Sequence, residues 1–227
     1  MPEKITYTTF DGVKIVGDWY PAPITSGVVV LMHTMPTTRK IMAPFAQVLA
    51  KHNVGSLAID FRGHGESTQT DDGDILDYQK FNDSQHQQYL IDAIGAVDWL
   101  KSKNYSEGQI MMVGASIGAN IAIWMLEQNP ALAGAVMLSP GIYRGIDAVE
   151  SATHAKFHQA LWAAGSDSDD TEAYETAKEL IEQADVNRKK FVPYKNAGHG
   201  IHLFTSDPKL MEDLAAWIQE TFQMPTA

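Results

Sequence analysis

The sequence of 227 residues contains no cysteine. Disulfide bonds, thiolate metal sites and a cysteine nucleophile are therefore excluded. No apolar stretch approaches the ~20 residues that a membrane-spanning helix needs. Basic residues are also scarce: 17 lysines and arginines stand against 28 acidic residues, which gives a formal net charge of −11. Because such a chain is not attracted to phosphates, we expect neither nucleic acid nor a membrane surface as a partner.

The first residues lack the charged-then-apolar layout of a secretory signal, so we expect a cytoplasmic protein. With 44% hydrophobic residues, the chain can fill one large core. No internal repeat, low-complexity segment or linker divides it. We therefore expect a single domain that covers residues 1–227.

The hydrophobic pattern changes after the first 20 residues. Residues 4–10 and 13–20 have a strand pattern and are joined by an Asp-Gly turn, which predicts an antiparallel pair. From residue 27 onward, short apolar runs alternate with helical patterns. This alternation predicts an α/β fold: a mostly parallel, doubly wound sheet of about eight strands, with an antiparallel N-terminal edge and helices on both faces. The polar stretch 68–83 is expected to be the longest structureless loop.

Residues 114–118 read GASIG and lie between a strand pattern and a helical pattern. At such a turn the serine hydroxyl is exposed at the carboxyl end of the strand, and the glycines let the two backbones approach closely. The helix N-terminus behind the serine supplies unpaired N–H groups and the positive end of a dipole. Ser116 is therefore the candidate nucleophile of a serine hydrolase.

The other candidate residues follow later strands. In a parallel sheet, ligands bind at the carboxyl ends of the strands. The loops at that edge contribute Ser116, then the acidic run 167–170, then His199. The order serine, acid, histidine along the chain is that of α/β-hydrolases.

Four motifs carry a resemblance that extends over essentially the whole chain. They are LMHTMP at 31–36, DFRGHGES at 60–67, GASIG at 114–118 and GHG at 198–200. On these motifs the chain resembles the α/β-hydrolases, in particular small bacterial serine esterases without a lid. The resemblance implies an ester or thioester substrate of small size, no cofactor and no metal. Only residues 141–157 separate two late strands, so we expect a minimal cap or none.

Roles for individual residues follow from the same resemblance. Ser116 would be the nucleophile and His199 the base that takes its proton. In similar proteins the triad acid lies about three residues past the glycine that ends its strand, which is Ser168 here. Asp169 is therefore the preferred acid, with Asp167 second and Asp170 third.

The resemblance also implies an oxyanion hole made of two backbone N–H groups. One is that of Ile117, directly after the nucleophile, and the other is that of Met35. Pro36 has no N–H and cannot serve.

The remaining polar candidates are expected to have structural roles, with one exception. These are His33 and His64 as structural histidines, Arg62 as a brace for its loop, and Asp92 as a surface or capping charge. His202 is the exception, as the one rival base to His199. A non-catalytic binding protein, a peptidase and a perhydrolase stay open as alternatives. Nothing in the sequence specifies the acyl group, the alcohol or the oligomeric state.

Overall fold

The computed structural model describes residues 2–224. Its centre is a sheet with the strand order β1-β2-β4-β3-β6-β7-β10-β11, and the short β5 pairs with β2. β1 (Glu3–Thr8) and β2 (Val13–Tyr20) form the antiparallel edge. The parallel strands are β3 (Val28–Met32), β4 (Gly55–Ile59), β6 (Ile110–Ala115), β7 (Gly134–Leu138), β10 (Ala160–Asp167) and β11 (Arg188–Lys195). The fold class predicted from the sequence is confirmed.

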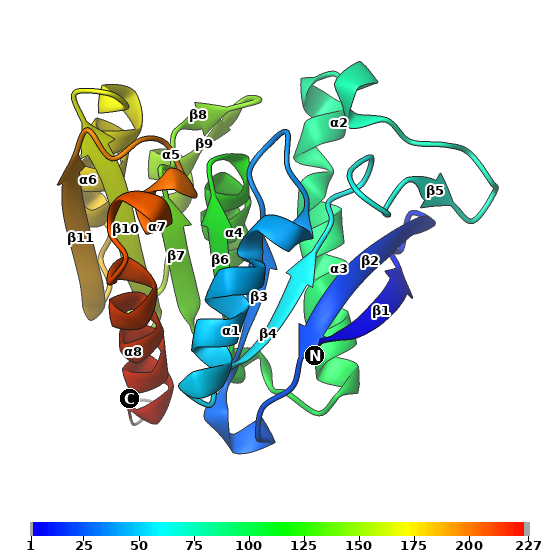
Figure 1. Ribbon diagram of the computed structural model, residues 1–227, viewed down its shortest axis with the longest axis horizontal. Helices are drawn as coiled ribbons and strands as arrows, with labels where there is room; N and C mark the ends of the chain where they lie inside the picture. The colour runs from blue at the N-terminus through cyan, green and yellow to red at the C-terminus, as the bar shows by residue number, and fades with distance from the viewer. Residues whose placement is uncertain (1, 225–227) are drawn as a thin grey trace.

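Helices cover both faces of the sheet (Figure 1). On one face lie α1 (Ala43–Lys51) and α8 (Leu210–Gln223), and on the other lie α3 (Tyr89–Ser102), α4 (Ile117–Gln128) and α6 (Thr171–Gln183). Each face has its own cluster of buried apolar side chains. No helix within residues 2–224 is both long and apolar enough to cross a bilayer.

The short elements are where the structure departs from the expected pattern. The stretch 68–83 is not structureless, because β5 (Gln69–Thr70) and the 3₁₀ turn η3 (Tyr78–Lys80) lie in it. The helical segment that follows is divided at Gln88 into α2 (Asp83–Gln87) and α3. After β7, a hairpin of β8 (Ile142–Tyr143) and β9 (Ile146–Asp147) precedes α5 (Ala148–Ala152). Two-residue strands are too short to show an alternation in the sequence. The remaining short elements are η1 (Ile24–Ser26), η2 (Arg39–Met42), η4 (Glu107–Gln109) and α7 (His202–Ser206).

The turn from β6 into α4 brings three backbone segments into contact. A Cβ on Gly114 would lie 2.0 Å from the carbonyl oxygen of Gly118. A Cβ on Gly118 would in turn lie 2.6 Å from the carbonyl oxygen of Met32, at the end of β3. No side chain fits at either position, so both glycines are required by close approach. The strand, the helix and the neighbouring strand are thereby held together at the turn that carries Ser116.

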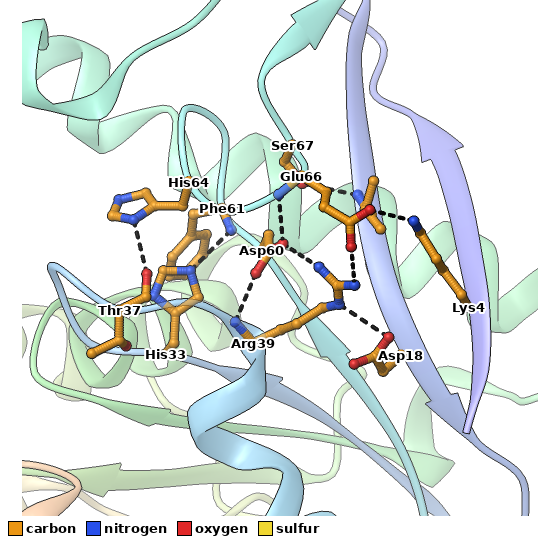
Figure 2. A network of polar contacts seen from close by, with 11 residues as sticks. Lys4, Asp18, His33, Thr37, Arg39, Asp60, Phe61, His64, Glu66 and Ser67 are labelled. Atoms are coloured by element: carbon orange, nitrogen blue, oxygen red, sulfur yellow. Dashed lines mark hydrogen bonds and ion pairs between the residues drawn. The ribbon is translucent and has the colours of Figure 1, made fainter. Parts of the chain in front are cut away.

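A buried ion-pair network ties the loop after β3 to the loop after β4 (Figure 2). The carboxylate of Asp60 is fully buried and accepts hydrogen bonds from the N–H of Arg39 at 2.7 Å and the N–H of Glu66 at 2.9 Å. The guanidinium of Arg39 pairs with Asp60 as well as with Glu66. Both loops are therefore fixed at the carboxyl edge of the sheet.

A second buried pair holds the loop after β4 to α3. The carboxylate of Asp92 is fully buried and accepts hydrogen bonds from the N–H and the Nε of Arg62, both at 2.8 Å. Arg62 also pairs with Asp11 in the β1–β2 turn. Arg62 does brace its loop, as predicted. The expectation that Asp92 is a surface or capping charge is wrong, because its side chain is fully buried. Its partner Arg62 lies 30 residues away in the sequence, and only the fold brings the two together.

Two neutral histidines link the loop after β3 to the loop after β4 by hydrogen bonds. His33 Nε2 accepts the N–H of Phe61 at 3.2 Å, and His64 Nδ1 lies 3.0 Å from the carbonyl oxygen of Thr37. Burial lowers the pKa of His33 to about 4. Burial, together with the neighbouring His33, lowers the pKa of His64 to about 3. Their contacts are those of structural histidines.

We expect Gly118→Ala to destabilise the fold by about 3 kcal/mol, since overpacking against backbone cannot be relieved by rotating a side chain. The free energy of unfolding in urea measures the effect. Gly108→Ala is the matched control, because its nearest neighbour would be a carbonyl oxygen at 3.8 Å. Equal losses in the two variants would contradict the close-approach argument.

We expect the stability of the protein to fall as the pH drops from 7 towards 5. The pKa values of His33 and His64 are lower in the folded protein than the ~6.5 of an unfolded histidine, so below pH ~6.5 the unfolded chain binds more protons. Each histidine then contributes a loss of up to about 1.4 kcal/mol per pH unit. Unfolding measured from pH 7 to pH 5 should give a shallower slope for His33→Gln and for His64→Gln. The exposed His154→Gln variant serves as the control. An unchanged slope in all three variants would refute the assignment of the pH dependence to His33 and His64.

Candidate functional site

Ser116 lies at the turn between β6 and α4 with a strained backbone. Its φ is 55° and its ψ −124°, a conformation that costs a non-glycine residue about 1–3 kcal/mol. The turn is fixed on one side by a 2.9 Å hydrogen bond from the N–H of Ser116 to the carbonyl oxygen of Leu138. Strand, turn and helix are thus arranged as the sequence predicts for a nucleophile. The side chain is half-buried at the carboxyl edge of the sheet, the upper edge in Figure 1.

His199 lies in the loop after β11, and its ring is paired with a carboxylate. The Nδ1 atom is 2.8 Å from Oδ2 of Asp170. The exposed fraction of the side chain is 37% for His199 and 16% for Asp170, so the pair is open to the solvent on the histidine side. A carboxylate on Nδ1 fixes the ring orientation and leaves Nε2 free for chemistry.

Asp169, preferred from the sequence as the histidine's partner, lies elsewhere. Its carboxylate accepts a 2.6 Å hydrogen bond from the hydroxyl of Ser166 and a 2.7 Å hydrogen bond from the N–H of Gly198. Asp167 accepts the N–H of Ser168 at 2.7 Å within its own loop. Of the three aspartates, Asp170 contacts the imidazole of His199, whereas Asp169, which the sequence favoured, does not. Ser168, between Asp167 and Asp169, has a left-handed backbone with φ 76°.

The histidine loop is held against the serine turn. A Cβ on Gly200 would lie 3.9 Å from the Cβ of Ser116, so the residue after His199 touches the serine turn. The N–H of Gly200 donates a 2.8 Å hydrogen bond to the hydroxyl of Ser139, which is fully buried in the loop after β7. Within residues 2–224, no hydrogen bond joins the hydroxyl of Ser116 to His199. Catalytic hydrogen bonds are often long in a protein without its substrate and tighten on binding.

Two backbone N–H groups near Ser116 have no acceptor in the described part of the chain. They belong to Ile117 and Met35. Ile117 is the first residue of α4, so no carbonyl oxygen precedes it by one helical turn. Met35 follows β3 in the loop that Figure 2 shows tied to Asp60. Both groups are available to a ligand oxygen.

The hairpin of β8 and β9 is anchored to the helix that begins at Ser116. Asn120 is fully buried, and its side chain bonds the carbonyl oxygens of Gly141 at 2.6 Å and Ile146 at 2.8 Å. The ring of Tyr143 in this hairpin lies edge-on to that of His199, with 6.0 Å between ring centroids. Sequence reasoning missed this hairpin. Asn120, an asparagine within the apolar pattern of α4, indicates a buried polar partner but does not indicate that this partner is a hairpin.

A polar pocket of about 340 Å³ opens beside the Met35 loop. Its lining includes Pro36 after β3, Tyr78 of η3, and Arg144 at the tip of the hairpin. Another pocket, of about 370 Å³, is lined by Phe157, Arg188 and Phe222, at the opposite edge of the sheet. Within residues 2–224, no group of three or more His, Cys, Asp or Glu side chains is arranged to hold a metal ion.

Comparison with solved structures shows the same fold in several hydrolases. An esterase of Pyrococcus furiosus superposes with a TM-score of 0.79 at 19% identity and covers 99% of this chain and 91% of its own. An α/β hydrolase of a Penicillium species gives a TM-score of 0.79 at 14% identity, over 99% of this chain and 100% of its own. A dienelactone hydrolase of Anabaena variabilis gives a TM-score of 0.71 at 17% identity, over 98% of this chain and 97% of its own. At these identities the likeness concerns the fold alone.

Comparison of the sequence with curated proteins gave no significant match. A family model described as serine aminopeptidase, S33, matches residues 23–164. That segment runs from the turn before β3 into β10 and includes the serine turn, so it covers well over half of the chain. The chain therefore belongs to this serine aminopeptidase family, within the α/β-hydrolase superfamily.

Proposed function

We propose that the protein is a serine hydrolase that cleaves a carboxylic ester or thioester through an acyl-Ser116 intermediate. The observation that carries this proposal is the 2.8 Å pair of His199 with Asp170, in a loop whose Gly200 touches the serine turn. A paired histidine beside a serine in a strained turn is the arrangement needed to activate a hydroxyl group. The partner is a small ester or acyl compound.

The reaction then proceeds in two halves. The oxygen of Ser116 attacks the ester carbonyl while His199 Nε2 takes the hydroxyl proton. The carbonyl oxygen becomes an oxyanion, which accepts hydrogen bonds from the N–H groups of Ile117 and Met35. His199 returns the proton to the departing alcohol or thiol, and the acyl group stays on Ser116. Water, deprotonated by His199, releases the acid in the second half.

In this mechanism Asp170 stabilises the imidazolium that forms in each half. A buried or partly buried carboxylate on Nδ1 holds the tautomer in which Nε2 accepts a proton. The exposed fraction of Asp170 is only 16%, so its interaction with the imidazolium is screened less than that of a surface pair.

A peptidase is the second candidate, because the family model that matches is described as serine aminopeptidase. The same acyl-serine chemistry cleaves an amide, but the leaving amine needs protonation before it can depart. An ester hydrolase is favoured by the likeness to a structure described as an esterase. Hydrolysis of aminoacyl p-nitroanilides, compared with p-nitrophenyl esters, separates the two activities.

We expect the protein to hydrolyse p-nitrophenyl esters of acids between acetate and octanoate, and Ser116→Ala to lower kcat on the order of 10⁶-fold. Labelling of the wild type by a fluorophosphonate probe gives an independent measurement, since it requires an activated serine. An enzyme that neither turns over these esters nor takes the label would point to a binding function. Label without ester turnover would point to a different acyl substrate.

We expect Asp170→Asn to lower kcat by roughly 10³- to 10⁴-fold, because the histidine would lose its charged partner. Asp169→Asn is the matched control: it removes a neighbouring charge that contacts Ser166 and Gly198 instead of the imidazole. Its kcat should fall far less. A larger loss of kcat in Asp169→Asn than in Asp170→Asn would identify Asp169 as the triad acid.

A further inference from the structure

The polar pocket beside the Met35 loop is formed by four segments, of which η3 and α2 are close in the sequence and the other two are distant. Met35 and Pro36 come from the loop after β3, Tyr78 and Phe81 from the segment around η3, and His86 and Arg144 from α2 and the β8–β9 turn. The volume of about 340 Å³ is within the usual range of small-molecule sites. It therefore has room for several non-hydrogen atoms of a substrate.

This pocket shares structural elements with the proposed reaction centre. Met35 belongs both to its wall and to the loop whose N–H we assign to the oxyanion. On the other side, Arg144 follows Tyr143, whose ring is in edge contact with that of His199. Asn120 fixes the hairpin to the first turn of α4. The Met35 loop and the β8–β9 hairpin thus belong to the surroundings of both the pocket and the proposed reaction centre.

Arg144 is the cation of this pocket, and its backbone is fixed. It is in the left-handed region with φ 55°, followed by Gly145 with φ 78°, and Gln87 Nε2 donates a 2.8 Å hydrogen bond to its carbonyl oxygen. The guanidinium contacts the carboxylate of Asp83 at 3.2 Å through Nη1 only. Within residues 2–224 its other N–H groups have no protein acceptor. Since the two side chains are 43% and 63% exposed, their pairing is weak and leaves the guanidinium available.

His86 contributes a second polar atom. The side chain is 2% exposed, and Nδ1 lies 3.0 Å from the hydroxyl of Tyr89. Nε2 has no hydrogen-bond partner within residues 2–224, although the residue lines the pocket. Burial and then the charge of Arg144 lower the pKa of His86, so the ring is neutral near pH 7. His64 Nδ1 donates to the carbonyl oxygen of Thr37, so the Nε2 of this neutral ring accepts the hydroxyl proton of Tyr89 at 2.9 Å. The oxygen of Tyr89 therefore accepts from His86 Nδ1–H, and His86 Nε2 is an acceptor at the pocket wall.

We propose that this pocket binds a carboxylate group that the substrate carries in addition to its ester, with the guanidinium of Arg144 as its contact. The inference rests on the proposed ester hydrolysis and specifies its substrate class. Such substrates are half-esters of short dicarboxylic acids, with the carboxylate on the acyl side, or acyl esters of short hydroxy acids, with it on the alcohol side.

A fully apolar acyl chain fits this pocket less well. It would cover the free N–H groups of Arg144 without offering an acceptor, and desolvated donors without partners are costly. A carboxylate supplies that acceptor, and a planar guanidinium is suited to contact both carboxylate oxygens. The side chains of Met35, Pro36 and Phe81 can cover the methylene groups between carboxylate and ester.

Two substrate pairs test the proposal by selectivity. Monomethyl glutarate and the methyl ester of glutaramic acid differ only in carboxylate against amide on the acyl side. 4-Acetoxybutyrate and 4-acetoxybutyramide make the same comparison on the alcohol side. We expect the wild type to prefer one carboxylate over its amide by about tenfold or more in kcat/KM, as a charge-assisted hydrogen bond allows. The pair that shows the preference identifies the side on which the carboxylate lies.

The variant Arg144→Gln should bring that ratio close to one, whereas Asp83→Asn should keep or raise it by removing the competing carboxylate. Lys101→Gln removes one positive charge on α3, where Lys101 pairs with Glu107, and should leave the ratio unchanged. A wild type without any carboxylate preference, or a preference that survives in Arg144→Gln, would overturn the proposal.

A binding measurement separates this inference from the proposed activity. Calorimetric titration of Ser116→Ala with monomethyl glutarate and with its amide needs no turnover. Preferential binding of the carboxylate that is lost in Ser116→Ala/Arg144→Gln supports the pocket even where the wild type hydrolyses no ester, which would be a failure of the proposed function alone. Ester turnover without any carboxylate preference in either assay would leave the hydrolase standing and refute the anion pocket.

Discussion

The arrangement of the site depends on one backbone contact, that between Gly114 in β6 and Gly118 in α4. With hypothetical Cβ distances of 2.0 Å and 2.6 Å to carbonyl oxygens, neither position can carry a side chain. The contact places the start of α4 against the ends of β6 and β3. Ser116 lies between the two glycines, and its left-handed backbone is maintained because both ends of the turn are fixed. The same contact sets the N–H of Ile117 near the loop that carries Met35.

The buried ion pairs of this fold fix the positions of loops and add little net stability. Burying Asp60 with Arg39, and Asp92 with Arg62, costs desolvation that the attraction within each pair roughly offsets. What each pair does provide is a unique geometry for the chain at the carboxyl edge. Asp60 joins the loops after β3 and β4 (Figure 2), and Asp92 joins the second of these loops to α3. Loops held in this way can present backbone N–H groups in fixed positions.

The sequence predicts those parts of the fold that have a local signature. β2 begins and ends as the pattern of residues 13–20 indicates, and the parallel strands form from short apolar runs, since an edge hairpin alternates and a buried parallel strand is a continuous apolar run. The serine turn is readable because close approach demands glycine at two fixed positions. The β8–β9 hairpin and the burial of Asp92 are not readable. The first has two residues per strand, and the second depends on a partner 30 residues distant.

Which of the three aspartates contacts His199 could not be predicted from the local sequence pattern. Asp167, Asp169 and Asp170 have the same chemistry and nearly the same place in the chain, yet each has different partners: its own loop, the backbone of the histidine loop, and the imidazole. The backbone conformation of this loop, in which Ser168 has a φ of 76°, has no signature in the sequence. The two adjacent carboxylates therefore have different roles. Asp169 fixes the backbone on which His199 is carried, and Asp170 fixes the ring itself, so the position and the orientation of the imidazole are set by separate hydrogen bonds.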